Sequence, residues 1–175
     1  MRKLKLTELN RDTIGDYRSK NKIPVVLILD DIRSALNVGS VFRTSDAYLI
    51  EKICLCGITA QPPHKEITKS AIGATDSVEW EYHEKVTSCI GELKKENYTI
   101  LGIEQTNESI QLDKYQIISD AKYALIFGNE VNGISDDLLP MIDDALELPQ
   151  FGTKHSLNIS VCAGIVIWDF WKALN

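Results

Sequence analysis

The sequence predicts a single α/β domain built on a mainly parallel sheet with helices on both faces. Short apolar runs alternate with segments of helical periodicity, and this alternation is typical of βαβ units, whose strands lie parallel. The length of 175 residues suits one domain, and 44% hydrophobic and 25% charged residues are the composition of an ordinary globular protein. Ligands bind such sheets at the carboxyl ends of the strands. We therefore expect a binding site at the turns that follow Leu29, Ile103, Phe127 and Leu148.

Six apolar runs are the expected strands. The first, Pro24–Leu29, is apolar throughout, which is the pattern of a parallel strand buried on both faces. The other expected strands cover residues 52–57, 78–82, 98–103, 123–127 and 145–148. The polar segment 104–120 is the longest irregular connection between them, and it is a candidate for contacting a ligand.

Four segments have the pattern of helices. They cover residues 37–48, 84–96, 135–142 and 156–172, and each follows one of the expected strands. The clearest is 84–96, where apolar residues recur at helical spacing and charged residues fall on the other face. The apolar positions of this helix are Val86, Cys89, Ile90 and Leu93.

Charge is distributed unevenly along the chain. The net charge is −6, but residues 1–22 carry +4 and the remainder carries −10. We predict a basic N-terminal arm at residues 1–22 and a single domain at residues 23–175. Such an arm is compatible with an RNA partner, because neutralising phosphates favours lysine and arginine. It is equally compatible with a solvated terminus.

The four cysteines, Cys54, Cys56, Cys89 and Cys162, form no CxxC pair and no Cys/His group at zinc spacing. We therefore expect reduced core residues, with no disulfide framework and no metal site. The first residues contain no apolar signal segment, and no apolar run approaches the roughly 18 residues of a membrane span. These observations predict a cytoplasmic protein without membrane contact.

A first polar segment that can carry chemistry follows the strand ending at Leu29. A helix is expected to begin near Asn37, whose side chain suits the N-cap position. Gly39 lies one helical turn before Arg43 and would leave open space along the arginine stem. Arg43 could equally be an ordinary surface arginine. The pair Asp30–Asp31 could bind a metal, but capping or solvation is the favoured interpretation.

A second segment, Gly128–Gly133, follows the apolar strand 123–127. A glycine at a strand end lets a ligand approach the backbone, and Glu130 would then lie at the edge of the sheet. Glu130 could instead be a helix N-terminal charge or part of a loop salt bridge. Ser135 is suited to cap the helix expected after this loop.

A third segment begins at Leu148 and leads into the last helix. Its first turn is expected to offer Ser156 and Asn158, and small residues follow at positions 160, 162, 163 and 164. Small residues permit close approach of another backbone, in helix–sheet packing or in a subunit interface. His155 beside Ser156 is not by adjacency a catalytic pair, because a serine–histidine site depends on spatial geometry.

Two common nucleotide-binding motifs are missing. No G-x-G-x-x-G follows the first strand, so neither a dinucleotide site nor the common glycine-rich methyltransferase loop is supported. Residues 152–156 contain no Gly-Lys-Ser/Thr, so nucleotide hydrolysis is not supported either.

Taken together and in this order, the three segments resemble the three motifs of the SpoU, or TrmH-like, family of RNA ribose methyltransferases in the SPOUT superfamily. The first is similar to N-x-G-x-x-x-R-T, the second to G-x-E-x-x-G, and the third to I/L-P followed by S-L-N-V-S. The matching segments read Asn37-Val-Gly-Ser-Val-Phe-Arg43-Thr, Gly128-Asn-Glu130-Val-Asn-Gly133, and Leu148-Pro with Ser156-Leu-Asn158-Ile-Ser. One departure is Ser34-Ala35, where many members have Asp-Pro.

The resemblance implies a Rossmann-like α/β fold with a C-terminal trefoil knot, S-adenosyl-L-methionine as methyl donor, and transfer to a ribose 2′-hydroxyl of tRNA or rRNA. It also implies a homodimer with a composite site, with neither DNA nor a membrane as a partner. Arg43 would be the main catalytic residue, arranged together with the ribose by Asn37, Glu130, Ser156 and Asn158. The cofactor would lie against Ile103, Glu104, Gly128, Leu148 and Leu157.

Two questions about the implied chemistry stay open at this stage. Because a guanidinium stays protonated in nearly all proteins, we favour Arg43 as a group that grips the adjacent phosphate and stabilises charge on the 2′-oxygen. Proton abstraction by a transiently neutral Arg43 is the rival account. The competing functions are a non-catalytic RNA-binding module with the same fold and an α/β enzyme that uses another nucleotide. The RNA and the nucleotide it modifies are not determined.

Overall fold

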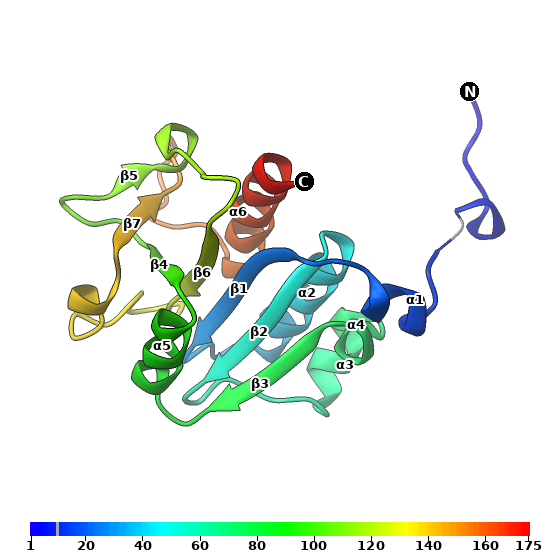
Figure 1. The fold of residues 1–175 in the computed structure, drawn as a ribbon, viewed down its shortest axis with the longest axis horizontal. Helices are drawn as coiled ribbons and strands as arrows, with labels where there is room; N and C mark the ends of the chain where they lie inside the picture. Colours follow the sequence, from blue (N-terminus) through cyan, green and yellow to red (C-terminus); the bar gives the residue numbers. More distant parts are fainter. Residues whose placement is uncertain (10) are drawn as a thin grey trace.

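The computed structural model describes residues 1–9 and 11–175 and contains a seven-stranded sheet in which neighbouring strands are parallel (Figure 1). The strand order is β3-β2-β1-β6-β4-β7-β5. The strands are β1 (Ile23–Asp30), β2 (Ile50–Cys56), β3 (Glu79–His83), β4 (Tyr98–Ile103), β5 (Ile110–Gln111), β6 (Lys122–Phe127) and β7 (Asp144–Glu147). The predicted fold class is confirmed, and the six expected strands lie within two residues of their predicted ends. The short β5 lies within the segment that was expected to be irregular.

Three of the four expected helices are present. They are α2 (Ala35–Ala47), α5 (Val86–Lys95) and α6 (Ile159–Leu174). Three short helices that sequence periodicity did not predict are α1 (Ile14–Ser19), α3 (Lys65–Ala71) and α4 (Ala74–Ser77). These span two turns or fewer, too short for a repeating apolar pattern to be visible in the sequence. Single-turn 3-10 helices occur at Leu6–Glu8 (η1), Leu112–Lys114 (η2) and Leu139–Met141 (η3).

The helix expected at residues 135–142 is wrong. This segment forms turns and then η3, in which Pro140 occupies one of the first two positions. Proline lacks the backbone N–H that a continued α-helix requires. The Ser135 hydroxyl donates to the Asp137 carboxylate instead of capping a helix.

The central strands of the sheet are buried on both faces. Alternate residues of β1 point into two cores: Val25 and Leu27 pack with the α2, α3 and α6 side, while Val26 and Ile28 pack with α5. Helix α6 is fixed on the sheet by an edge-to-face contact between Phe170 and Tyr123 of β6, whose ring centroids lie 5.2 Å apart. The central strands are therefore continuous apolar runs because both faces of each strand are covered by helices.

Gly39 has a different role from the one expected. A Cβ at this position would lie 2.1 Å from the Ser70 hydroxyl oxygen and 2.5 Å from the Ile67 carbonyl oxygen. The glycine therefore allows α2 and α3 to pack closely. The expectation that it leaves open space along the Arg43 stem is wrong, because α3 fills that space.

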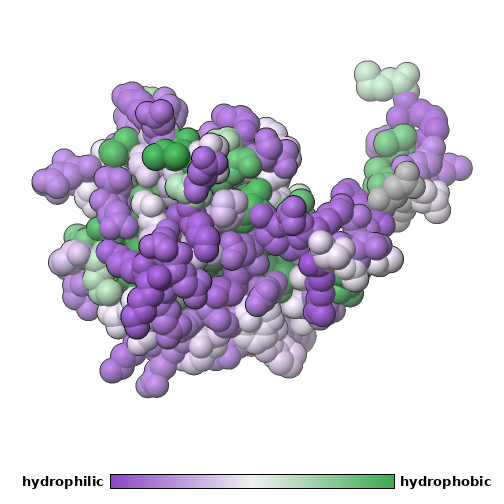
Figure 2. Space-filling model, in the orientation of Figure 1, coloured by the Kyte–Doolittle hydropathy of each residue, from purple (hydrophilic) through white to green (hydrophobic). Residues whose placement is uncertain are grey.

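The N-terminal segment is attached to the domain through α1. The Tyr17 side chain is buried, and Arg18 Nη2 donates to the Asp76 carbonyl oxygen at 2.6 Å. Residues 1–9 project away from the domain, and their surface is mainly hydrophilic (Figures 1 and 2). Asn10 lies outside the described residues, and the role of residues 1–22 as an RNA-binding arm stays a prediction. No helix in the described part of the chain is long and apolar enough to cross a bilayer.

The two aspartates after β1 have separate environments. Asp31 Oδ1 accepts from the Ile58 backbone N–H at 2.9 Å, so it caps the turn after β2. Asp30 is buried, and burial, reinforced by the charges of Asp31 and Asp137, raises its pKa from 3.8 to about 6. The charged form of Asp30 therefore destabilises the native state at neutral pH.

We expect Asp30→Asn to raise the free energy of unfolding at pH 7, by at most about 3 kcal/mol. Because Asp30 is protonated in both states below its unfolded pKa, the gain should disappear as the pH falls from about 6 through 3.8. Thermal unfolding of both proteins between pH 3.5 and pH 7.5 measures this difference. An equal effect at every pH would show that the carboxylate charge is not its cause.

Candidate active site

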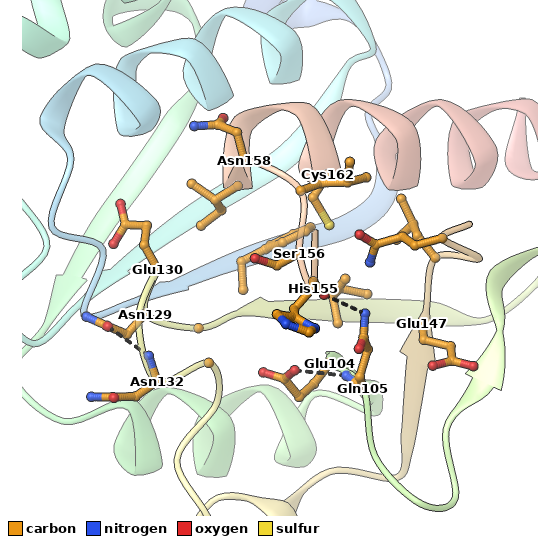
Figure 3. A pocket seen from close by; sticks show the side chains of 18 of the residues that line it. Glu104, Gln105, Asn129, Glu130, Asn132, Glu147, His155, Ser156, Asn158 and Cys162 are labelled. Carbon is orange, nitrogen blue, oxygen red and sulfur yellow. Dashed lines mark hydrogen bonds between the residues drawn. The ribbon is translucent and has the colours of Figure 1, made fainter. Parts of the chain in front are cut away.

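A cavity of about 590 Å³ opens at the carboxyl ends of β4, β6 and β7 (Figure 3). Its walls are the turns after these strands, the exposed loop 149–158 and the first turn of α6. The five residues expected to contact a cofactor all line it: Ile103, Glu104, Gly128, Leu148 and Leu157. Three of the four predicted turns thus border one cavity. The turn after Leu29 contributes through its backbone, which holds Glu130.

The Gly128–Gly133 loop is closed by two backbone hydrogen bonds between Asn129 and Gly133, at 3.0 and 2.8 Å. A Cβ on Gly128 would lie 2.3 Å from the Gly133 carbonyl carbon. Gly133 has φ +68°, and a Cβ there would lie 2.0 Å from Glu104 Oε2. Both glycines are therefore required for the loop to fold back on itself and onto Glu104.

Glu130, Asn37 and Asn158 form one hydrogen-bonded group, although they lie in three separate segments of the sequence. Asn37 Nδ2 donates to Glu130 Oε1 at 3.2 Å, and Asn158 Nδ2 donates to Asn37 Oδ1 at 3.2 Å. Glu130 also accepts from the backbone N–H of Arg33 at 2.9 Å and of Ser34 at 3.1 Å. The carboxylate thus lies at the N-terminus of α2, where the helix dipole favours a negative charge.

The helix caps differ in part from the prediction. Ser34 is the N-cap of α2 and accepts from the Asn37 backbone N–H at 3.3 Å, so Asn37 lies inside the helix. Its expected N-cap role is wrong, and its amide is free to bridge Glu130 and Asn158. Asn158 is the N-cap of α6, accepting from the Ser160 backbone N–H at 2.9 Å. Ser156 lies in the loop before α6 and lines the cavity.

The hydrogen bonds around Glu130 change its titration. Burial on its own would raise the pKa of Glu130, but the backbone N–H of Arg33 and Ser34 and the Asn37 amide outweigh burial and lower this pKa below 4.5. Glu130 is therefore ionised at neutral pH, and its charge stabilises the folded state.

We expect Glu130→Gln to lower the Tm at pH 7. The difference from the parent protein should shrink as the pH falls below 4.5 towards the depressed folded-state pKa, because Glu130 of the parent protein then becomes protonated in the folded as well as the unfolded state. Thermal unfolding across this range measures the effect. Glu108→Gln, at an exposed loop position, is the matched control, and it should show no comparable loss.

The charge of the cavity has one sign. Among the described lining residues, Glu104, Glu130 and Glu147 are acidic, and neither lysine nor arginine is present. Glu104 holds the loop in place, since it accepts from the backbone N–H of Ile134 at 2.9 Å and of Gln105 at 2.8 Å. Such a lining favours a cationic ligand over a polyphosphate.

A model of the SpoU rRNA Methylase family matches residues 24–168. The chain belongs to this family. A similar curated protein is the 23S rRNA (guanosine-2'-O-)-methyltransferase RlmB of Vibrio vulnificus, 26% identical over 162 residues that cover 93% of this chain and 64% of that protein. The chain spans slightly less than two thirds of the curated relatives that it matches first.

Two solved structures show the same fold as this SpoU-family chain. The AdoMet-bound rRNA methyltransferase from Sinorhizobium meliloti has a TM-score of 0.81 at 21% identity, over 93% of this chain and 60% of that chain. The A. aeolicus TrmH/SpoU tRNA modifying enzyme has a TM-score of 0.81 at 20% identity, over 91% of this chain and 80% of that chain.

Arg43 is the site residue that this SpoU-family chain does not bring to the cavity. Its side chain is exposed on α2, six residues beyond Asn37. It lines a second hollow, of about 490 Å³, together with Arg11 and Asp46. Glu130, Ser156 and Asn158 therefore line the main cavity, Asn37 is hydrogen-bonded to Glu130 and Asn158 at its edge, and Arg43 of the same chain does not line it.

The lining residues that were not predicted include Cys162 and Asn129. Cys162, expected in the core, is half-buried on the first turn of α6 and lines the cavity. Asn129 donates from Nδ2 to the Asp31 carbonyl oxygen at 2.8 Å and accepts from the Val131 backbone N–H at 2.9 Å, so it ties the loop to the end of β1. In the sequence, the only indication that Asn129 lies at the cavity was its position between Gly128 and Glu130.

Proposed function

We propose that this chain is an S-adenosyl-L-methionine-dependent methyltransferase that modifies a ribose 2′-hydroxyl of tRNA or rRNA. The observation that carries the proposal is the cavity at the ends of β4, β6 and β7, with Glu130, Asn37 and Asn158 hydrogen-bonded at its edge. Family membership supports the same reaction class.

The residues of the cavity fit the proposed cofactor. A volume of about 590 Å³ lies in the range of about 300–1,000 Å³ that small-molecule sites usually have. The acidic lining suits a sulfonium and an amino group, whereas NAD or ATP would bring phosphates to a surface without lysine or arginine among its described residues. Ile103, Glu104, Gly128, Leu148 and Leu157 would hold the cofactor.

The chain's own groups would then orient the ribose and stabilise the negative charge that develops on its 2′-oxygen. The bound cofactor supplies an electrophilic methyl group. Glu130 and Asn158 fix Asn37 in one orientation, and Ser156 offers a hydroxyl on the opposite loop. Arg43 would grip the adjacent phosphate bidentately and stabilise the negative charge that develops on the 2′-oxygen. Holding the two reactants in line supplies much of the acceleration in such a transfer.

We further propose a homodimer with a composite site. Val161, Ile165 and Trp168 lie on one face of α6 at helical spacing and are 52%, 43% and 46% exposed. An apolar stripe of this kind on a surface helix is suited to a two-fold interface. The dimer would bring the partner subunit's Arg43 to a cavity that Arg43 of the same chain does not line.

The knot and the cellular location are also part of this proposal. β4 lies between β6 and β7, so the chain that leaves β6 must pass β4 before it enters β7 and α6. This order supports a C-terminal trefoil knot around the cofactor site. An enzyme that acts on tRNA or rRNA would work in the cytoplasm.

We predict that the N-terminal arm docks RNA. Because Tyr17 is buried, the deletion should stop before α1 and remove residues 1–12 only. This deletion should weaken RNA binding and flatten its salt dependence, since fewer phosphates would be neutralised. Filter binding at several salt concentrations measures both quantities, with cofactor affinity as the control. Unchanged RNA affinity would leave residues 1–12 as a solvated terminus.

The reaction is tested by transfer of labelled methyl from S-adenosyl-L-methionine to unmodified tRNA and rRNA pools, with the product mapped by 2′-O-methyl sequencing. Labelled ribose in either pool supports the proposal and identifies the nucleotide. RNA binding without transfer would favour a non-catalytic RNA-binding module. A larger thermal shift with NAD or ATP than with S-adenosyl-L-methionine would favour an enzyme of another nucleotide.

A further inference from the structure

A group of metal-ligating side chains lies on the α5 side of the sheet, away from the candidate active site. Cys54 and Cys56 are two residues apart in β2, so they point to the same face. Their neighbours in the parallel register with β3 are Glu81 and His83. The buried Cys89 of α5 covers this face. The alternation of side chains along β2 and β3, together with the packing of α5, thus places thiol, imidazole and carboxylate groups on one face of the sheet.

The ligand atoms of this group lie close to one another. One ligand atom from each of Cys54, His83 and Cys89 lies within 4.8 Å of the other two. Glu81 Oε1 is 3.4 Å from Cys54 Sγ and 3.0 Å from His83 Nε2. Neighbouring ligand atoms of a tetrahedral zinc ion lie about 3.3–3.8 Å apart, as bonds of about 2.0–2.3 Å require.

The burial of the group suits a structural ion. Cys54 and Cys89 are fully buried, while the side chains of His83 and Glu81 are 13% and 41% exposed. The thiols close the inner side, and an ion can enter past the histidine and the carboxylate. Lys52 Nζ, 2.7 Å from Glu81 Oε1, holds the carboxylate at the rim of the group.

We propose that Cys54, His83 and Cys89 bind Zn²⁺, with Glu81 facing the fourth coordination position. Two soft sulfur ligands and one imidazole in tetrahedral geometry favour zinc over magnesium or calcium. The ion replaces the two thiol protons, which pass to solvent, and the cysteines bind as thiolates. It would join β2, β3 and α5 at one point. The site has no recognisable spacing in the sequence, because its ligands come from three separate elements.

Cobalt titration of the whole chain tests this proposal independently of the methyl transfer activity. Reduced protein, first treated with a chelator, is titrated with Co²⁺, which shows a thiolate charge-transfer band when cysteines bind it. We expect one equivalent of Co²⁺ per chain to produce the band. Zn²⁺ should abolish the band, since it binds such sites more tightly, and should raise the Tm.

Variants distinguish cobalt binding at this site from cobalt binding at other cysteines and from unfolding of the protein. Cys54→Ser and Cys89→Ser should abolish the band, whereas Cys162→Ser, which removes a cysteine outside the group, should keep it. His83→Gln changes only the rim of the core and should weaken cobalt binding at least about tenfold while the far-UV spectrum is unchanged.

Three results would overturn the zinc proposal. They are a parent protein without the thiolate band, a band that survives in Cys54→Ser, and a Cys54–Cys89 disulfide in place of a metal in the purified protein.

Discussion

Arg43→Ala is expected to lower kcat for methyl transfer about 100- to 1,000-fold, the usual cost of removing a group that stabilises charge in the transition state. Cofactor affinity should not change, because Arg43 is exposed on α2 and does not line the cavity of its own chain. Steady-state methyl transfer at saturating RNA measures the first quantity, and isothermal titration with S-adenosyl-L-methionine measures the second.

Two results would contradict the role proposed for Arg43. Full activity in the alanine variant would remove Arg43 from the mechanism. A loss of cofactor affinity equal to the loss of rate would show that Arg43 shapes the cavity instead of acting on the RNA. The parent enzyme's pH–rate profile tests the rival account, because a base must be deprotonated to act and would produce a break where it titrates.

Gly128→Ala is expected to abolish cofactor binding at concentrations that saturate the parent protein. A Cβ here would lie 2.3 Å from the Gly133 carbonyl carbon and 2.4 Å from the Ile134 backbone nitrogen, so one wall of the cavity must move. Overpacking of this kind costs about 1–3 kcal/mol, which leaves a folded protein to examine. Titration with S-adenosyl-L-methionine and thermal unfolding measure the two effects.

Gly91→Ala is the matched control for Gly128→Ala. Gly91 lies in α5, and a Cβ there would meet nothing within 4 Å. Alanine should therefore keep cofactor binding and stabilise the helix by about 0.5–1 kcal/mol. Normal cofactor binding by Gly128→Ala would mean that the loop can yield without affecting the cavity.

A heterodimer of these variants tests the composite site. One subunit carries Arg43→Ala and the other carries Gly128→Ala, and the pair is isolated through two different tags. If Arg43 serves the cavity of the partner subunit, the first subunit has an intact cavity and receives an intact arginine. About half of the parent dimer's activity should then remain, because one of two equivalent sites is complete. Activity near zero would place Arg43 and its cavity in the same subunit.

The strands could be predicted because their cause is local in the sequence. Pro24–Leu29 is apolar throughout, and the strand it predicts is buried on both faces in the structure. The helix starts were harder, because several polar residues in a row can cap a helix equally well. Ser34 caps α2 in place of Asn37. Which of these residues caps the helix depends on the path of the chain between the end of β1 and the first turn of α2.

The glycines illustrate a second limit. Gly39 and Gly128 were correctly singled out, but the reason for each lies in what packs against it: the distant helix α3 for the first, and the backbone of Gly133 in the same folded loop for the second. A sequence shows that a side chain is absent. It does not show which atoms occupy the space.

The sequence by itself determined the alternation of strands and helices, the family, and the five residues expected to contact a cofactor, all of which line the cavity, because the pattern of apolar residues and three short motifs carry that information. Only the tertiary structure decided which of these residues meet. It joins Asn37, Glu130 and Asn158 by hydrogen bonds, directs Arg43 elsewhere, and brings Cys54, His83 and Cys89 within 4.8 Å of one another. The physical reason is that strand register and helix packing determine distances between segments remote in the chain, and such distances leave no fixed spacing in the sequence.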